Sequence, residues 1–227
     1  MAADFSDAAL IFDLDGTLVD TADDLAASMN HALAGEGLGP VAAQEVRGLV
    51  GHGARRMLMR GYELSAGRAV SDKELDHTLA HFLSHYRENI AVHSRPFDHA
   101  VEMLESFRAA GMRAAICTNK REGNAVQLIE ALGLSHLFET IVGGDTASAA
   151  KPDPAPVHLC LERTGVRRAV FLGDSDTDIR AANAANLPCL LADFGYGPIT
   201  LKSDAAAVFS HYREAAELIG GLLHAQT

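Results

Sequence analysis

Several features that mark particular protein classes are missing from this sequence. No apolar run is long enough to cross a bilayer, and there are only three cysteines. Cys117, Cys160 and Cys189 are odd in number, widely spaced and set among apolar residues, a pattern typical of reduced buried thiols rather than of a disulfide framework. The first residues are acidic where a secretory signal would be basic. We therefore expect a cytoplasmic protein that has no membrane partner.

Clusters of basic residues are also missing. The formal net charge is -11, and no Lys/Arg-rich run occurs in the chain. Nucleic-acid binding draws mainly on phosphate neutralisation by basic clusters, so nucleic acid is excluded as an expected partner. An acidic protein can still bind a small anion where a few cations and backbone N–H groups converge. Any anionic ligand must therefore be held by local groups of this kind.

The most informative stretch is a short apolar run that ends in two carboxylates. Residues 10–12 lead into Asp13 and Asp15, and a glycine turn follows at Gly16. This pattern is typical of a buried strand in a parallel sheet, and ligands bind beyond the carboxyl ends of such strands. Two carboxylates so close together repel each other unless a positive charge lies beside them, and a divalent cation with oxygen ligands fits. The alternative is a turn that only ends the strand.

The part of the chain after this strand carries helical patterns and no strand signal. Its longest predicted helix begins with a capping box formed by Ser71 and Glu74. His77, His81 and His85 recur at every fourth position of that helix, a spacing that also suits a metal site. Because His77 lies nearly opposite the apolar face of the helix, we interpret these histidines as a solvated face instead.

From about residue 95 onwards, helices and strands alternate. This alternation predicts an α/β fold with a doubly wound parallel sheet. We expect a Rossmann-like core of residues 1–19 and 93–227, with a helical cap domain of residues 20–92 inserted after the first strand. An insertion at this place must lie over the strand ends. It would form a lid with hinges near residues 17–21 and 89–96.

Polar side chains follow several of the predicted strands. Because the carboxyl ends of parallel strands lie at one edge of a sheet, we expect these distant residues to form one site. The set combines carboxylates, a lysine, a hydroxyl and a turn rich in N–H groups, which is what a phosphoryl group requires. Each member has a simpler interpretation as a cap, a loop or a turn, but their joint occurrence favours a site. The residues are Asp13, Asp15, Thr118, Asn119, Lys151, Asp174 and Asp178.

The order of these residues resembles the haloacid dehalogenase superfamily. The resemblance covers nearly the whole chain, and the ordered set of motifs is highly specific. The motifs are Asp13-Leu14-Asp15-Gly16-Thr17-Leu18, Thr118-Asn119-Lys120, Lys151-Pro152 and Gly173-Asp174-Ser175-x-x-Asp178.

The resemblance implies a phosphatase mechanism for the two aspartates of the first motif. Asp13 would be the nucleophile that forms an aspartyl-phosphate. Asp15 would protonate the leaving alcohol and then activate the hydrolytic water, a division of roles that adjacent carboxylates can provide.

The resemblance also implies Mg2+ as the cofactor. Its ligands would be the Asp13 carboxylate, the Asp15 backbone carbonyl and Asp174, with Asp178 in or next to the coordination shell, and hard oxygen ligands suit this ion. The residues that would bind the phosphoryl oxygens are Thr118, Asn119, Lys151 and Gly16.

A glycine-flanked segment in the predicted cap is the candidate for substrate selection. Gly51, His52 and Gly53 let the backbone approach a ligand, and Arg55 can grip a second anionic group such as a carboxylate. The segment resembles the substrate-recognition loop of phosphoglycolate phosphatases. Two alternatives stay open, namely that Arg56 is the inward-facing arginine and that the segment is only a glycine-hinged helix start with solvated arginines.

The predicted function is therefore Mg2+-dependent hydrolysis of a phosphomonoester, with 2-phosphoglycolate as the expected substrate. The partner would be a small anionic phosphate ester, and the protein a monomer or homodimer. One alternative is a phosphatase of another small ester or sugar phosphate, or a phosphomutase similar to β-phosphoglucomutase. A non-enzymatic binding module is more remote, because such a protein could lose Asp13 or Asp15 without harm to folding.

Overall fold

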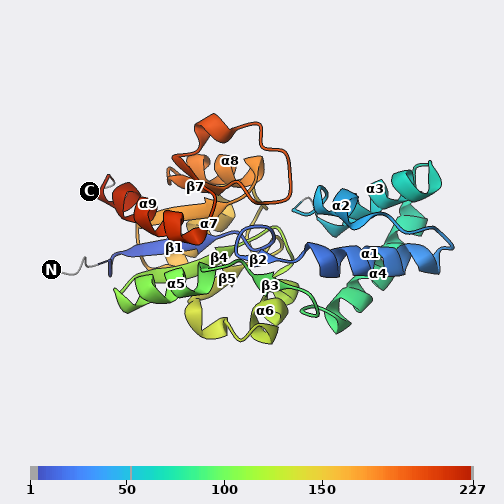
Figure 1. Ribbon diagram of the computed structural model, residues 1–227, viewed down its shortest axis with the longest axis horizontal. Helices are drawn as coiled ribbons and strands as arrows, with labels where there is room; N and C mark the ends of the chain where they lie inside the picture. The colour runs from blue at the N-terminus through green and yellow to red at the C-terminus, as the bar shows by residue number, and fades with distance from the viewer. Residues whose placement is uncertain (1–4, 52, 226–227) are drawn as a thin grey trace.

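The computed structural model describes residues 5–51 and 53–225, and a six-stranded parallel sheet forms its centre (Figure 1). The strand order is β5-β4-β1-β6-β7-β8. β1 thus lies between β4 and β6, so the chain changes direction across the sheet at the end of β1. The predicted α/β fold with a doubly wound sheet is confirmed. The strands are β1 Ala8–Phe12, β4 Arg113–Cys117, β5 Thr140–Val142, β6 Arg168–Gly173, β7 Cys189–Ala192 and β8 Ala207–Phe209.

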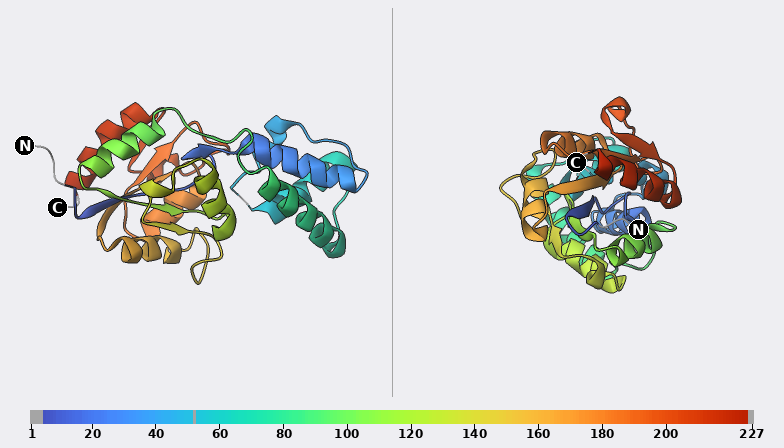
Figure 2. Two further views of the ribbon diagram at one scale, coloured as in Figure 1. Left: turned by 90° about the horizontal axis from the view of Figure 1, so that it is seen from below. Right: turned by 90° about the vertical axis from the view of Figure 1, so that its left-hand side faces the viewer.

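Helices cover both faces of this sheet (Figure 2). Since β1 is buried on both sides, its residues are apolar throughout: Leu10 and Phe12 join one core, while Ala9 and Ile11 join the other. Short 3-10 turns span Ser135–Leu137 and Lys202–Asp204. The helices on the Phe12 face are α5 Ala100–Ala109, α6 Glu122–Ala131 and α9 Tyr212–His224, and those on the Ile11 face are α7 Ala155–Thr164 and α8 Asp176–Ala184.

Four helices lie together at one end of the molecule, beyond the carboxyl ends of the strands (Figures 1 and 2). We call this group the cap. The predicted capping box is confirmed, because the Ser71 hydroxyl accepts a bond from the Glu74 N–H and the Glu74 carboxylate accepts one from the Ser71 N–H. The helices are α1 Ala22–Gly35, α2 Ala43–Arg47, α3 Ala54–Ala66 and α4 Asp72–Glu88.

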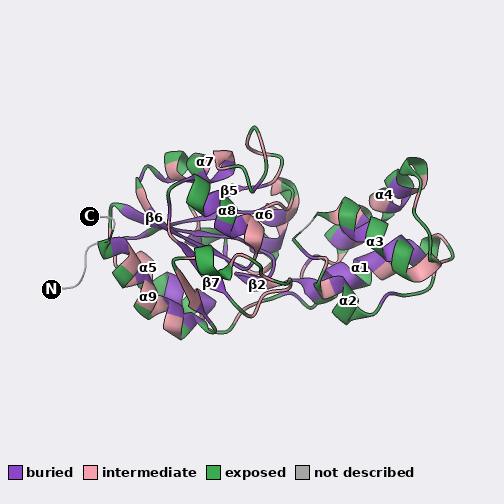
Figure 3. Ribbon diagram, turned by 90° about the horizontal axis from the view of Figure 1, so that it is seen from above, coloured by how far each residue is buried: buried purple, intermediate pink, exposed green. Residues whose placement is uncertain are grey.

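The outer surface of the cap is exposed and its inner faces are buried (Figure 3). His77 and His81 on α4 are exposed, in agreement with a solvated face. His85 departs from that prediction: it is half-buried, stacks on His31 with ring centroids 4.1 Å apart, and contacts the Ser28 hydroxyl at 3.1 Å. His85 lies one turn further along α4, at a position where this helix faces α1.

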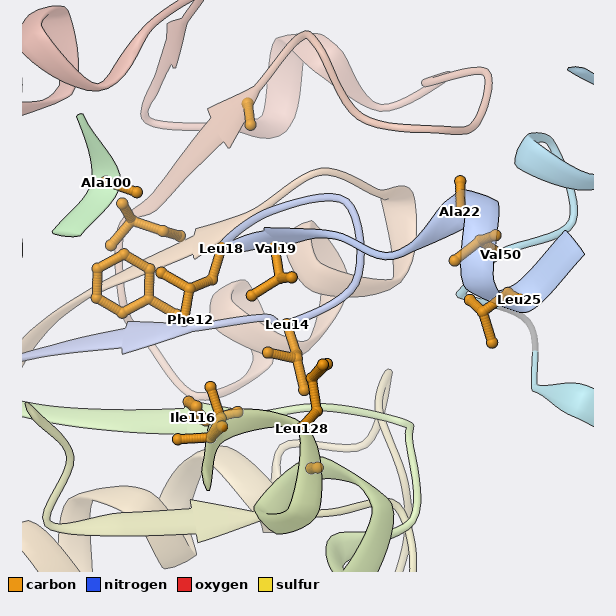
Figure 4. Close-up of a cluster of buried hydrophobic side chains, with 14 of the residues drawn as sticks. Phe12, Leu14, Leu18, Val19, Ala22, Leu25, Val50, Ala100, Ile116 and Leu128 are labelled. Carbon is orange, nitrogen blue, oxygen red and sulfur yellow. The ribbon is translucent and has the colours of Figure 1, made fainter. Parts of the chain in front are cut away.

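The two crossings between core and cap form a small antiparallel pair. β2 (Val19–Asp20) pairs with β3 (Arg95–Pro96). The prediction of an insertion without strands from residue 20 is therefore wrong at Asp20, which belongs to β2. A strand of two residues is too short to show a periodic pattern in the sequence. Buried apolar side chains continue along this crossing into the cap, as Figure 4 shows for Leu14, Val19 and Leu25. Core and cap thus share one hydrophobic cluster.

The three cysteines occur in the structure as free thiols. Cys117, Cys160 and Cys189 are all buried and unpaired. No helix within the described ranges combines the length and the apolar character that a bilayer crossing requires.

Candidate active site

Three buried aspartates meet at the carboxyl ends of β1 and β6. Asp13 follows β1, Asp174 follows β6, and Asp178 lies in the first turn of α8. One carboxylate oxygen of each residue lies within 4.8 Å of the others, and the residues are only 7%, 5% and 0% exposed, respectively. Such a set of oxygen donors fits a hard divalent cation such as Mg2+.

The electrostatics of this cluster also favour a cation. Burial raises the pKa of Asp13 to about 6; the Asp178 and Asp15 carboxylates add to this effect, whereas Lys151 opposes it. Burial together with the Asp178 and Asp13 carboxylates raises the pKa of Asp174 to about 8. Without a metal cation, Asp13 and Asp174 therefore ionise less readily than an ordinary aspartate.

Lys151 links the predicted nucleophile to Asp178. Its Nζ lies 2.9 Å from Asp13 Oδ1 and 2.6 Å from Asp178 Oδ1, and its side chain is 2% exposed. Burial disfavours the ammonium form, but the Asp13 and Asp178 carboxylates outweigh burial and raise the pKa of Lys151. Asn119 Nδ2 donates to the Lys151 carbonyl at 3.0 Å and so holds the lysine loop against β4. A permanent cation thus lies beside Asp13.

Asp174 and Asp178 differ in their partners. Asp174 accepts bonds from the Thr17 hydroxyl at 2.9 Å and from the Tyr196 N–H at 3.2 Å. Asp178 Oδ2 accepts from the Ser175 hydroxyl at 2.6 Å, while its Oδ1 binds Lys151. Asp178 thus holds Lys151 and the turn after β6, and its place in or next to the coordination shell stays a prediction.

Gly16 is the turn residue between the two halves of the first motif. Its φ of +87° lies in the left-handed region, and a Cβ atom built at this position would lie 2.5 Å from Asp174 Oδ2. The position requires glycine for two reasons: the backbone conformation and the closeness of the predicted metal ligand. Its predicted role in phosphate binding stays a prediction.

Gly16→Ala is expected to lower kcat for phosphate-ester hydrolysis by roughly 100-fold or more, because the new methyl group displaces Asp174 by a distance that catalysis does not tolerate. Gly37→Ala is the matched control, since Gly37 has a φ of +73° but no atom lies within 4 Å of its added Cβ. Both variants should unfold at lower temperature, yet only Gly16→Ala should lose activity. Equal activities in steady-state assays would contradict the steric argument.

Asp15 lies where the core meets the cap. The Thr21 hydroxyl donates to Asp15 Oδ1 at 2.6 Å, and Lys120 Nζ lies 2.7 Å from Oδ1 and 2.9 Å from Oδ2. The Lys120 side chain is 7% exposed. The sequence placed Lys120 in the second motif but assigned it no role. Its position directly after Thr118 and Asn119, at the ligand edge of the sheet, was the available signal.

A cavity of about 540 Å³ lies between the sheet edge and the cap. Asp13, Lys151 and Asp174 line it from the core, together with Thr118, which is buried directly after β4. Phe82 and Tyr86 of α4 line it from the cap, with the loop before α3. A small ligand in this cavity would be enclosed by both parts of the protein.

The predicted cap residues occupy one wall of the same cavity. Gly51, Gly53 and Arg55 line it, whereas His52 lies outside the described residues and Arg56 is not a lining residue. The Arg55 side chain is 45% exposed and its guanidinium group binds two carboxylates of α4: Nη1 contacts Asp76 and Nη2 contacts Asp72 at 3.1 Å. In this conformation Arg55 therefore joins α3 to α4, and a role in substrate binding stays a prediction.

Tyr196 is a second residue that the sequence did not reveal. Its hydroxyl donates to Asp20 Oδ1 at 2.6 Å and accepts a bond from the Thr21 N–H at 2.6 Å, while its own N–H binds Asp174. Arg47 of the cap also binds Asp20, at 2.9 Å. One loop of the core thus contacts both the crossing into the cap and a predicted metal ligand.

Comparison with known proteins agrees with this geometry. The family described as haloacid dehalogenase-like hydrolase matches residues 10–192. A protein from Mesorhizobium japonicum named phosphoglycolate phosphatase is 43% identical over 206 residues, which cover 89% of this chain and 90% of the relative. One from Agrobacterium fabrum with the same name is 42% identical, covering 84% and 82%.

The fold is also similar to that of a solved structure. A crystal structure of a predicted phosphoglycolate phosphatase from Haemophilus somnus superimposes with a TM-score of 0.86 at 28% identity, covering 94% of this chain and 97% of the other. The order of the motifs, the arrangement of the aspartates and these matches agree. The chain belongs to the haloacid dehalogenase-like hydrolases.

Proposed function

We propose that this protein is a Mg2+-dependent phosphomonoesterase that converts 2-phosphoglycolate into glycolate and phosphate. The observation that carries the proposal is the buried pair of Asp13 and Lys151, which faces the cavity between core and cap beside Asp174. A nucleophilic carboxylate, a fixed cation and a set of oxygen ligands are the parts that phosphoryl transfer needs. The name of the relatives from Mesorhizobium japonicum and Agrobacterium fabrum supports the substrate.

In the proposed reaction, a carboxylate oxygen of Asp13 attacks phosphorus, and the bond from phosphorus to the ester oxygen breaks. Asp15 gives its proton to the departing alkoxide, so that glycolate leaves and an aspartyl-phosphate remains on Asp13. Asp15 then takes a proton from water, which attacks the phosphorus and releases phosphate and free Asp13. Lys151 and Thr118 bind the phosphoryl oxygens throughout. Asp13 and Asp174 would hold Mg2+, which would supply positive charge next to the phosphoryl group.

The cap has a clear purpose in this scheme. An aspartyl-phosphate must react only with the intended acceptor, and Phe82 and Tyr86 of the cap line the cavity above it and so restrict access. The domain boundaries at residues 19/20 and 92/93, the cytoplasmic location and the monomeric or homodimeric state stay predictions.

The test is phosphate release in the presence of Mg2+ from 2-phosphoglycolate, compared with sugar phosphates, nucleotides and pyrophosphate. We expect kcat/KM for 2-phosphoglycolate to exceed that for each other substrate by at least about 10-fold, because one extra charged contact in a closed site is worth that much. Activity that favours a different ester would retain the phosphatase chemistry and remove the substrate. No hydrolysis of any ester would contradict the proposed function itself.

A further inference from the structure

Lys120 is a buried cation that the phosphoryl-transfer steps do not use. It follows Thr118 and Asn119 in the loop after β4 and lines the cavity. Burial disfavours its ammonium form, but the Asp15 carboxylate and the nearby Tyr86 outweigh burial and raise the pKa of Lys120. Lys151 already serves Asp13 on the phosphoryl side. The second ammonium group lies instead beside Asp15, on the side where the leaving group must depart.

Tyr86 approaches the same place from the cap. It lies on α4, is 1% exposed, and its ring centroid is 4.9 Å from Lys120 Nζ. Its hydroxyl oxygen is buried and close to the Lys120 ammonium group, but no described residue meets it with the geometry of a full hydrogen bond. A buried hydroxyl group without such a partner is costly, and a ligand that accepts a hydrogen bond would remove the cost. A cation from the core and a hydroxyl from the cap thus face one wall of the cavity.

The chemistry of the substrate brings a carboxylate to this wall. Asp15 must contact the ester oxygen in order to protonate it. In 2-phosphoglycolate the carboxylate carbon lies two bonds beyond that oxygen, so the carboxylate must lie close to Asp15. Lys120 Nζ is 2.7 Å and 2.9 Å from the two Asp15 oxygens, and an ammonium group has three donors. Lys120 is therefore in reach of the substrate carboxylate without leaving Asp15.

We propose that Lys120 and Tyr86 form the binding site for the carboxylate of the substrate. This inference rests on the proposed function and deepens it. The site would select phosphate esters in which the carbon that bears the ester oxygen also carries a carboxylate. The ligand would join core and cap, since Lys120 belongs to one and Tyr86 to the other. The assignment differs from the one that sequence resemblance gives to Arg55, whose guanidinium group is already bound by Asp72 and Asp76.

The experiment compares two phosphate esters of primary alcohols, 2-phosphoglycolate and ethyl phosphate, the second of which has a methyl group in place of the carboxylate. Lys120→Met should lower kcat/KM for 2-phosphoglycolate by about 100-fold, the effect of losing a buried charge-assisted bond, and that for ethyl phosphate by less than about 5-fold. Tyr86→Phe should change the same ratio of kcat/KM values in the same direction by about 10-fold. Arg55→Gln, which tests the alternative assignment, should leave the ratio within about 3-fold, the range of an exposed contact.

Two outcomes would overturn the inference. One is an equal loss on both substrates in Lys120→Met, which would indicate that the lysine only positions Asp15. The other is a change of the ratio in Arg55→Gln but not in Lys120→Met. If the unmodified enzyme itself shows no preference for 2-phosphoglycolate over ethyl phosphate, the proposed substrate fails instead, so the two failures are distinguishable.

A binding measurement provides a readout without turnover. In the Asp13→Asn background, 3-phosphonopropionate has the shape and charges of the substrate but no cleavable ester, and propylphosphonate lacks its carboxylate. By calorimetry with Mg2+ present, 3-phosphonopropionate should bind at least about 10-fold more tightly than propylphosphonate, and adding Lys120→Met should remove this difference. An unchanged difference in the double variant would contradict the inference even if Lys120→Met alone were poorly active.

Discussion

Asp13→Asn is expected to lower kcat for phosphate release by about 10^4-fold or more, the scale of removing a catalytic nucleophile. The amide has no carboxylate oxygen with which to form the acyl phosphate. The fold should survive, because the amide oxygen can still accept a bond from Lys151, which contacts Asp13 Oδ1 at 2.9 Å. The substitution also removes the repulsion between the Asp13 carboxylate and the carboxylates of Asp178 and Asp15. This repulsion adds to burial in raising the pKa of Asp13.

Initial rates with Mg2+ and thermal unfolding measured on the same preparations would test this prediction. Asp98→Asn is the matched control: it makes the same chemical change at an exposed aspartate outside the cavity and should leave both quantities unchanged. Intact mass spectrometry after rapid quenching should detect a phosphorylated form of the unmodified enzyme but not of Asp13→Asn. Retention of more than about a tenth of the activity would assign the nucleophile to another residue.

The phosphoryl half of this site could be predicted from the sequence because each of its residues lies in a local motif. Asp13, Thr118 and Asp174 directly follow strands, and the rule that parallel strands end at one edge then brings them together. The capping box of Ser71 and Glu74 was predictable for the same reason, since both partners lie within one turn. Where the determining signal lies within a few residues, the sequence is sufficient.

The leaving-group half was not predictable in the same way. Tyr86 has the helical spacing of a core residue on α4, and the sequence does not show that its face meets Lys120 rather than α1. Arg55 illustrates the converse, because its carboxylate partners lie 17 and 21 residues further along the chain on another helix. The pairing of β2 with β3 likewise depends on chain segments separated by the whole cap. Contacts of this kind arise from tertiary packing, which a periodic pattern does not specify.

Removal of Mg2+ is expected to abolish catalysis, with a fall in kcat of about 10^3-fold or more, and its effect on stability should depend on pH. In the metal-free protein the pKa of Asp13 is about 6 and that of Asp174 about 8, against 3.8 for an ordinary aspartate. At pH values between 3.8 and each raised pKa, the folded state binds more protons than the unfolded state. The free energy of unfolding of the metal-free protein therefore decreases as pH rises from about 4 to about 8 through these two groups.

Mg2+ should bind the ionised carboxylates and so remove this decrease in the free energy of unfolding. Its stabilising effect should therefore grow with pH. The rise in Tm on adding Mg2+ should be larger at pH 8 than at pH 5 by roughly 5 °C or more, on the scale of a few kcal/mol in a domain of this size. Asp174→Asn removes a predicted metal ligand and the group with the higher pKa, so this variant should lose the activity and the larger part of the pH-dependent Mg2+ effect. The difference between the curves with and without Mg2+ isolates the groups that the ion binds. Equal Tm shifts at both pH values, or activity that survives chelation, would show that the buried aspartates do not hold the ion.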